Sequence, residues 1–134
     1  MTTKAHLKWV DNERFLAKSG DSPTYVVDGS DENGAICPMQ MLLISAAGCT
    51  AIDVIGILTK KQVHLTEFEV NITGEEAQPL PQRYTQLSVE YVFYGRNIPS
   101  KAVEQAIRLS ETKYCCVMAT LNVKAEHSYK IIES

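Results

Sequence analysis

The sequence lacks the features that would divide the chain or attract a nucleic acid. Among its 134 residues no stretch rich in Pro, Gly and Ser offers a linker, so we predict a single domain over residues 1–134. The 13 Lys and Arg residues are outnumbered by 16 Asp and Glu residues, which gives a formal net charge of -3. Because there is no basic excess to neutralise a phosphate backbone, we expect no nucleic-acid partner.

The spacing of cysteine and histidine lacks the pattern of a metal site. The candidate ligands are Cys37, Cys49, Cys115, Cys116, His6, His64 and His127. They form neither a C-x-x-C pair nor a paired-histidine motif, which are the common spacings of zinc ligands. The spacing therefore predicts no metal site.

The segment Met1 to Leu7 lacks a basic region followed by an apolar run. Because a secretory signal needs both, we expect a cytoplasmic protein. Thiols stay reduced in that compartment. Four cysteines in such a chain therefore favour buried or reactive thiols over a structural disulfide framework.

The longest apolar segment, Met39 to Leu58, carries one charged residue, Asp53. Its polar and small residues do not gather on one face, which predicts a helix that is apolar nearly all round. A helix of this length would span about 30 Å, the thickness of a bilayer core, but a mid-span Asp, two Gly and a Gln argue against a membrane. A chain of this size has too little structure to surround the helix, so we expect an obligate homodimer whose copies share a core.

Before this helix, apolar and polar residues alternate in short segments separated by turn residues, which is typical of short strands. Ala5 to Trp9 and Arg14 to Lys18 predict a hairpin around the turn at Asp11-Asn12. Thr24 to Asp28 predicts a third strand, which ends in a turn cluster from Gly29 to Gly34.

After the helix, apolar and polar residues alternate again. The expected strands are Phe68–Ile72 and Leu87–Phe93, with a loop from Gly74 to Pro81 between them. A helix from Pro99, a buried apolar cluster at Tyr114–Met118 and a last strand at Leu121–Glu126 follow. The two middle strands read as antiparallel neighbours. The order of strands, long helix, two strands, helix and strand predicts an α+β fold.

Cys49 lies in the middle of the apolar helix, with Ser45 one turn before it and Asp53 one turn after it. Such a cysteine is either a small apolar side chain in a tight contact or a reactive thiol, and both interpretations also hold for Cys115. A carboxylate beside a thiol disfavours the thiolate unless a cation intervenes. Arg14 is the arginine nearest in the chain to the helix start. It is either a solvated turn residue or the group that stabilises a thiolate and donates to a peroxide oxygen.

Two cysteine-containing segments resemble the signatures of one protein family. The segment Pro38 to Val54 resembles a helix with the pattern P-x-x-x-L-L-x-A-x-x-x-C, whose final residue corresponds to Cys49, and the segment Ser110 to Cys115 resembles a second signature that also ends in a cysteine. Both belong to the OsmC/Ohr family, the osmotically inducible and organic hydroperoxide resistance proteins. The residues of both segments are similar to those of its YhfA-like branch, and the resemblance covers nearly the whole chain.

The resemblance implies antiparallel sheets wrapped around two central helices in an intertwined homodimer. It also implies a thiol-dependent peroxidase of oxidative stress defence, with its site where the subunits meet and no metal or other cofactor. Cys49 would attack the peroxide and become a sulfenic acid, and Cys115 would resolve it as a disulfide. The partners would be a small apolar hydroperoxide and a small thiol or dithiol reductant.

One position departs from the family pattern. Peroxidase members carry a glutamate ten residues before the first cysteine, where it orients the catalytic arginine, and Met39 stands at that position here. Gln40 can hydrogen-bond an arginine but cannot form an ion pair with it, and Asp53 is another candidate partner for Arg14. The departure leaves open a non-catalytic dimer that senses redox state or binds an apolar ligand. In a third hypothesis both cysteines are inert core residues.

Overall fold

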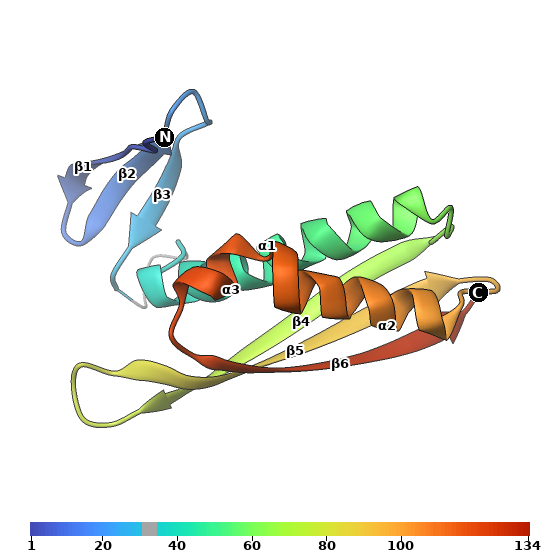
Figure 1. Ribbon diagram of the computed structural model, residues 1–134. Coiled ribbons are helices and arrows are strands. Elements are labelled where there is room, and N and C mark those ends of the chain that lie inside the picture. Colours follow the sequence, from blue (N-terminus) through green and yellow to red (C-terminus); the bar gives the residue numbers. More distant parts are fainter. Residues whose placement is uncertain (31–34) are drawn as a thin grey trace. The chain divides into compact units, whose positions relative to one another are not determined.

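A computed structural model describes residues 1–30 and 35–134 of the chain. The chain divides into two compact units, Met1–Leu42 and Leu43–Ser134. The single domain over residues 1–134 therefore stays a prediction. Figure 1 follows the chain through both units.

The first unit contains a three-stranded antiparallel sheet. Its strands are β1 (Ala5–Asp11), β2 (Arg14–Ser19) and β3 (Tyr25–Asp28), hydrogen-bonded in that order. The predicted hairpin is confirmed, and Asn12 in its turn has the left-handed backbone φ of 41° that asparagine tolerates well. Of the turn predicted from Gly29 to Gly34, residues 31–34 lie outside the described part of the chain.

The long helix α1 runs over Pro38–Lys60, slightly beyond the predicted bounds. Proline suits the first turn because the N–H that it lacks would have no helical partner there. The side chain of Gln40 accepts a hydrogen bond from the N–H of Cys37 at 3.1 Å and so caps this end. Gln62, just after the helix, takes the left-handed φ of 59° that commonly terminates helices.

The second unit contains the sheet of β4 (Glu67–Ala77), β5 (Arg83–Gly95) and β6 (Lys124–Glu133). Strands β4 and β5 are antiparallel neighbours, as predicted. The loop predicted from Gly74 is wrong, because Gly74 pairs with Leu87 and the strand continues to Ala77. A Cβ at Gly74 would lie 2.6 Å from the Tyr84 ring, so glycine here serves close packing and not a turn.

Strand β6 pairs with β5 in parallel, so this sheet is mixed and not purely antiparallel. The connection consists of α2 (Ser100–Leu109), a π-helical turn η1 (Ser110–Tyr114) and the short helix α3 (Cys116–Thr120). A helical crossover returns the chain to the end of the sheet from which the previous strand started, which makes the next strand parallel. The last strand also begins later than the sequence indicated and continues to Glu133.

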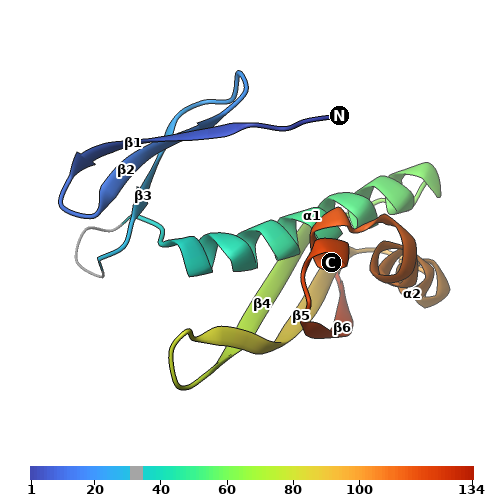
Figure 2. The same cartoon turned by 60° about the vertical axis from the view of Figure 1, so that its left-hand side comes forward.

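Helices α1 and α2 lie on the same face of the second sheet (Figures 1 and 2). The hydrophobic core lies between these helices and the sheet. It contains Val54 and Leu58 from α1, Val89, Tyr91 and Phe93 from β5, Ile98 from the loop that follows it, and Val103, Ala106 and Ile107 from α2. The helix predicted from Pro99 is thereby confirmed, and its buried apolar residues face this core.

The prediction that Tyr114–Met118 form a buried apolar cluster is wrong. Cys115 is buried at 5% exposure, whereas the side chain of Tyr114 is 46% exposed and Cys116 is exposed. The N–H of Cys115 donates to the carbonyl of Ser110 at 2.9 Å, which closes a wide π-helical turn. Because α3 starts directly after this turn, Cys115 points inward while its neighbours Tyr114 and Cys116 point outward.

The buried and exposed residues of α1 show which part of the helix one copy covers. Its length and apolar composition would suffice for a membrane span, but Val54 and Leu58 are fully buried in the core of the second unit. Ile44 and Ile52 are 59% and 71% exposed, and Ile55 is 38% exposed. One copy therefore leaves an apolar side of the helix uncovered. The absence of a membrane partner and the homodimer both stay predictions.

Candidate thiol site

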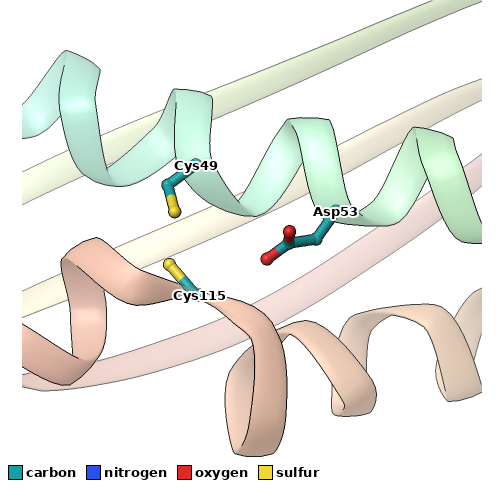
Figure 3. A group of neighbouring side chains, drawn as sticks. All are labelled: Cys49, Asp53 and Cys115. Atoms are coloured by element: carbon teal, nitrogen blue, oxygen red, sulfur yellow. The ribbon is translucent and has the colours of Figure 1, made fainter. Parts of the chain in front are cut away.

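Helix α1 places Cys49 and Asp53 on one side. Four residues make slightly more than one helical turn, so the two side chains leave the helix one above the other. Figure 3 shows both pointing toward Cys115. The regular helix thus supplies two of the three polar groups of the site.

The π-helical turn η1 brings Cys115 to this site. After the hydrogen bond from Cys115 N–H to the carbonyl of Ser110, the sulfur of Cys115 accepts the N–H of Met118 at 3.4 Å. Wide π-helical turns frequently occur at functional sites. The segment Ser110 to Cys115, picked out in the sequence by resemblance, coincides with this turn.

The two cysteines predicted to work together lie side by side. The sulfurs of Cys49 and Cys115 and a carboxylate oxygen of Asp53 all lie within 4.8 Å of one another, and both thiols are free. Cys49 is half-buried and Cys115 is buried. A disulfide needs a sulfur separation of about 2.05 Å, so the two sulfurs would have to approach by at most about 2.8 Å to form a bond.

The surroundings of Cys115 favour its protonated thiol. Burial is the main cause that raises its pKa, to about 11, and neighbouring Cys49 and Asp53 act in the same direction. The N–H of Met118 acts in the opposite direction, because it donates to the sulfur. Cys115 is therefore a thiol and not a thiolate at neutral pH.

Ser110 holds Asp53 in place. Its fully buried hydroxyl donates to Oδ2 of Asp53 at 2.9 Å. The sequence marked Ser110 only as the first residue of the second signature segment and indicated no partner for it. That pairing joins α1 to η1, and no local pattern indicates it.

Arg14 lies in the first unit, where its partner is Asp11. The Nε of Arg14 donates to Oδ1 of Asp11 at 2.6 Å, and Nη2 donates to the other oxygen. This hydrogen bond holds the pKa of Asp11 below its usual value and raises that of Arg14. Sequence reasoning considered Gln40 and Asp53 as partners and missed Asp11, although three residues across a hairpin turn was a usable signal. The role of Arg14 toward the thiols stays a prediction.

Two cavities of the second unit are each lined by one residue of the site. One has a volume of about 440 Å³ and is lined by Asp53 together with Ile52, Ile57, Leu109 and Tyr114, with Lys60 and Lys61 also on its wall. The other, of about 400 Å³, is lined by Cys115, Met118 and His127 and by charged residues such as Glu111 and Lys124. A small molecule therefore has room next to Asp53 and next to Cys115.

Beneath the site, β5 and β6 contribute a pair of polar rings. The hydroxyl of fully buried Tyr91 and Nδ1 of His127 lie 3.1 Å apart. Burial raises the pKa of Tyr91 to about 12 and lowers that of His127. Both groups are therefore neutral near pH 7, and neither was singled out from the sequence.

Fold and site together define a small α+β protein with two thiols facing each other between a long central helix and a π-helical turn. The family model described as OsmC-like protein matches residues 29–129. The chain belongs to the OsmC-like family.

Individual relatives agree with this assignment. Protein YhfA of Escherichia coli K12 is 35% identical over 131 residues, which cover 96% of this chain and 98% of that protein. A hypothetical protein from Aquifex aeolicus superposes with a TM-score of 0.89 at 26% identity, covering 100% of this chain and 98% of the other. The structure of an organic hydroperoxide resistance protein OsmC from Legionella pneumophila matches with a TM-score of 0.70 at 14% identity and 97% coverage of both chains, a likeness of fold alone. The predicted α+β, OsmC-like fold class is thus confirmed.

Proposed function

We propose that this protein is a thiol-dependent peroxidase that reduces organic hydroperoxides through Cys49 and Cys115. The carrying observation is the approach of their sulfurs to within 4.8 Å, although the two residues are far apart in the sequence. Cys49 is the more accessible thiol, which suits the group that meets the peroxide, and buried Cys115 suits the group that reacts afterwards. OsmC-like membership and the fold shared with a hydroperoxide resistance protein support the proposal.

The reaction proceeds in two oxidative steps. The thiolate of Cys49 attacks the terminal peroxide oxygen, the O–O bond breaks, and the alkoxide takes up a proton and leaves as an alcohol. Cys49 is then a sulfenic acid. The sulfur of Cys115 attacks the sulfur of Cys49, and the hydroxyl group leaves as water with the proton from Cys115, so that a disulfide remains. A small thiol or dithiol reopens this disulfide by exchange, supplies the two electrons and is itself oxidised to a disulfide, as the reducing cytoplasm would allow.

The surroundings of the thiols favour an apolar hydroperoxide. Ile52, Ile57 and Leu109 form part of the cavity that reaches Asp53, and apolar walls bind an alkyl chain better than they bind hydrogen peroxide. Arg14 is proposed as the cation that stabilises the Cys49 thiolate and donates to the peroxide oxygen. The homodimer is proposed because one copy leaves Ile44 and Ile52 of α1 largely exposed.

The test is a titration of reduced protein with cumene hydroperoxide, followed by counting free thiols and mapping disulfides by mass spectrometry. We expect one equivalent of peroxide to consume one Cys49–Cys115 pair per chain. Cys49→Ser should abolish the reaction, and Cys115→Ser should stop at a sulfenic acid that dimedone traps. Cys37→Ser and Cys116→Ser are matched controls and should react as the parent protein does. Intact thiols after the titration would refute the proposal.

A second candidate function is that of a non-catalytic dimer that senses redox state or binds an apolar ligand. Met39 replaces the glutamate expected in peroxidase members. In addition, an apolar groove of about 340 Å³ runs between α1 and β4, lined by residues such as Ile44, Ala47, Phe68 and Val70. Native mass spectrometry of freshly purified protein would then show a retained apolar ligand, or a reversible disulfide would form without continued consumption of peroxide.

A further inference from the structure

We propose that Cys49, Asp53 and Cys115 of the reduced protein bind a thiophilic divalent cation of the Zn²⁺ class. The carrying observation is that two sulfurs and one carboxylate oxygen from two separate elements converge within 4.8 Å (Figure 3). The site shares its residues with the proposed peroxidase reaction, but binding needs neither a peroxide nor turnover.

The arrangement is near that of zinc ligands. In a tetrahedral site Zn–S distances of about 2.3 Å and Zn–O distances of about 2.0 Å place neighbouring ligand atoms about 3.5 to 3.8 Å apart. Groups within 4.8 Å of one another therefore need to approach by at most about 1.3 Å. Three protein ligands leave the fourth position open for water or another small ligand. The cavity that Asp53 lines provides a route for entry.

The donor set selects the kind of metal. Sulfur ligands favour Zn²⁺ or Cd²⁺, whereas Mg²⁺ and Ca²⁺ require oxygen ligands and more of them. Residues four apart on a helix can bind one ion together, as the two histidines of H-E-x-x-H do, and Cys49 and Asp53 have this spacing. Within Leu43–Ser134, no ion pair of 4.0 Å or less joins Asp53 to a lysine or arginine.

Buried Ser110 acts as the outer support of such a site. Its hydroxyl donates to Oδ2 of Asp53 at 2.9 Å. Ligating carboxylates in metal sites are commonly fixed by such a hydrogen bond. The N–H of Met118 likewise donates to the sulfur of Cys115 and would help to balance its negative charge as a metal-bound thiolate.

Metal binding and disulfide formation exclude each other. Binding of the cation releases the two thiol protons, and the sulfur lone pairs then point at the metal. A disulfide between Cys49 and Cys115 removes both sulfur ligands and releases the ion. The bound cation therefore protects the thiols from oxidation, and oxidation of the thiols empties the site.

The first experiment titrates the reduced, chelator-treated full chain with Cd²⁺ and follows the sulfur-to-metal charge-transfer absorption. We expect one ion per chain, with the absorption lost in Cys49→Ser and Cys115→Ser. Asp53→Asn and Ser110→Ala should each weaken Zn²⁺ binding by about tenfold in competition with a chromophoric chelator. Cys37→Ser and Cys116→Ser should bind as the parent does.

The second experiment needs no variant. Zn²⁺ should slow the alkylation of Cys49 and Cys115 by about tenfold or more and leave exposed Cys116 unchanged, as read by mass spectrometry. Failure of Cd²⁺ or Zn²⁺ to bind, binding that survives loss of both site thiols, or binding that depends on Cys37 or Cys116 would each overturn the proposal. Peroxide titration of metal-free protein tests the peroxidase separately, so the two failures are distinguishable.

Discussion

The two units of this chain differ in how much of their apolar surface they bury. In the first unit, the residues described as buried are Ala17, Val27 and Asp28, while Leu7, Trp9, Val10, Leu16, Tyr25 and Val26 are exposed. The second unit buries nine residues in one core between its helices and its sheet. The difference shows that the second unit contains the interactions that stabilise a fold, whereas the first presents apolar side chains for further contacts.

Size explains this difference. A three-stranded sheet within 42 residues has too little volume to enclose its own side chains, and such small units generally need a partner surface. Residues 43–134 include helices long enough to cover one side of a sheet. We therefore expect stability to depend on the second unit, and function and assembly to depend also on the first.

The largest expected effect is on the core of the second unit. Leu58→Ala should lower the free energy of unfolding by about 2–5 kcal/mol, because Leu58 is fully buried and its loss leaves a cavity. Urea denaturation measures this change. Leu80→Ala, at an 80% exposed position between β4 and β5, is the control, and its cost should stay below about 0.5 kcal/mol. Equal effects at both positions would contradict the role of Leu58 in the core of the second unit.

A functional effect is expected from the first unit. Arg14→Ala should slow the oxidation of Cys49 by cumene hydroperoxide by about a hundredfold, because a charged hydrogen-bond donor is lost. The urea midpoint should change little, since Arg14 is not fully buried and its partner Asp11 is exposed to water. Stopped-flow thiol loss measures the rate.

Arg83→Ala is the matched control, because Arg83 is an exposed arginine at the start of β5. It should leave the rate unchanged. A rate that is also unchanged in Arg14→Ala would remove Arg14 from the proposed reaction and leave the thiol pair without that cation.

Assembly should respond to a charge on the uncovered side of α1. Ile52→Glu should weaken the dimer by about tenfold or more, because burying an unpaired carboxylate is costly. Sedimentation over a dilution series measures the change. Leu80→Glu, at an 80% exposed position between β4 and β5, is the control and should leave assembly unchanged. A monomeric parent protein would refute the homodimer.

The smallest expected effect concerns pH. Burial lowers the pKa of His127 on β6, and the charge of Glu111 in η1 acts in the opposite direction. The ring of His127 faces Tyr91 of β5, and the cavity beside it is also lined by Cys115, Lys113 and Lys124. The folded pKa lies below the unfolded value near 6.5, so the contribution of His127 to stability is complete above pH 6.5 and declines as pH falls through that region. Thermal unfolding between pH 7.5 and about 5 measures this loss. His127→Gln should flatten that part of the profile, and an unchanged profile would contradict the lowered pKa.

The sequence predicted elements better than their ends or partners. Alternation located the hairpin of the first unit and the antiparallel pair β4 and β5, because neighbouring residues determine which face is apolar. The alternation failed at Gly74, where we predicted a loop. Gly74 lies within β4, and a glycine is needed there because the Tyr84 ring occupies the space of a Cβ. The alternation also failed at Tyr114–Met118, where a π-helical turn buries Cys115 and exposes the residues on either side.

The sequence by itself determined the order of the elements, the family signatures, and the placement of Cys49 and Asp53 on one side of a helix. These properties follow from periodicity over a few residues. Tertiary structure alone decided that Cys115 and Ser110 meet that helix side, that the last strand is parallel, and that three potential ligands converge although no zinc-like spacing joins them. The reason is that contacts between residues distant in the chain depend on how helices pack on the sheet, and spacing along the chain does not specify that packing.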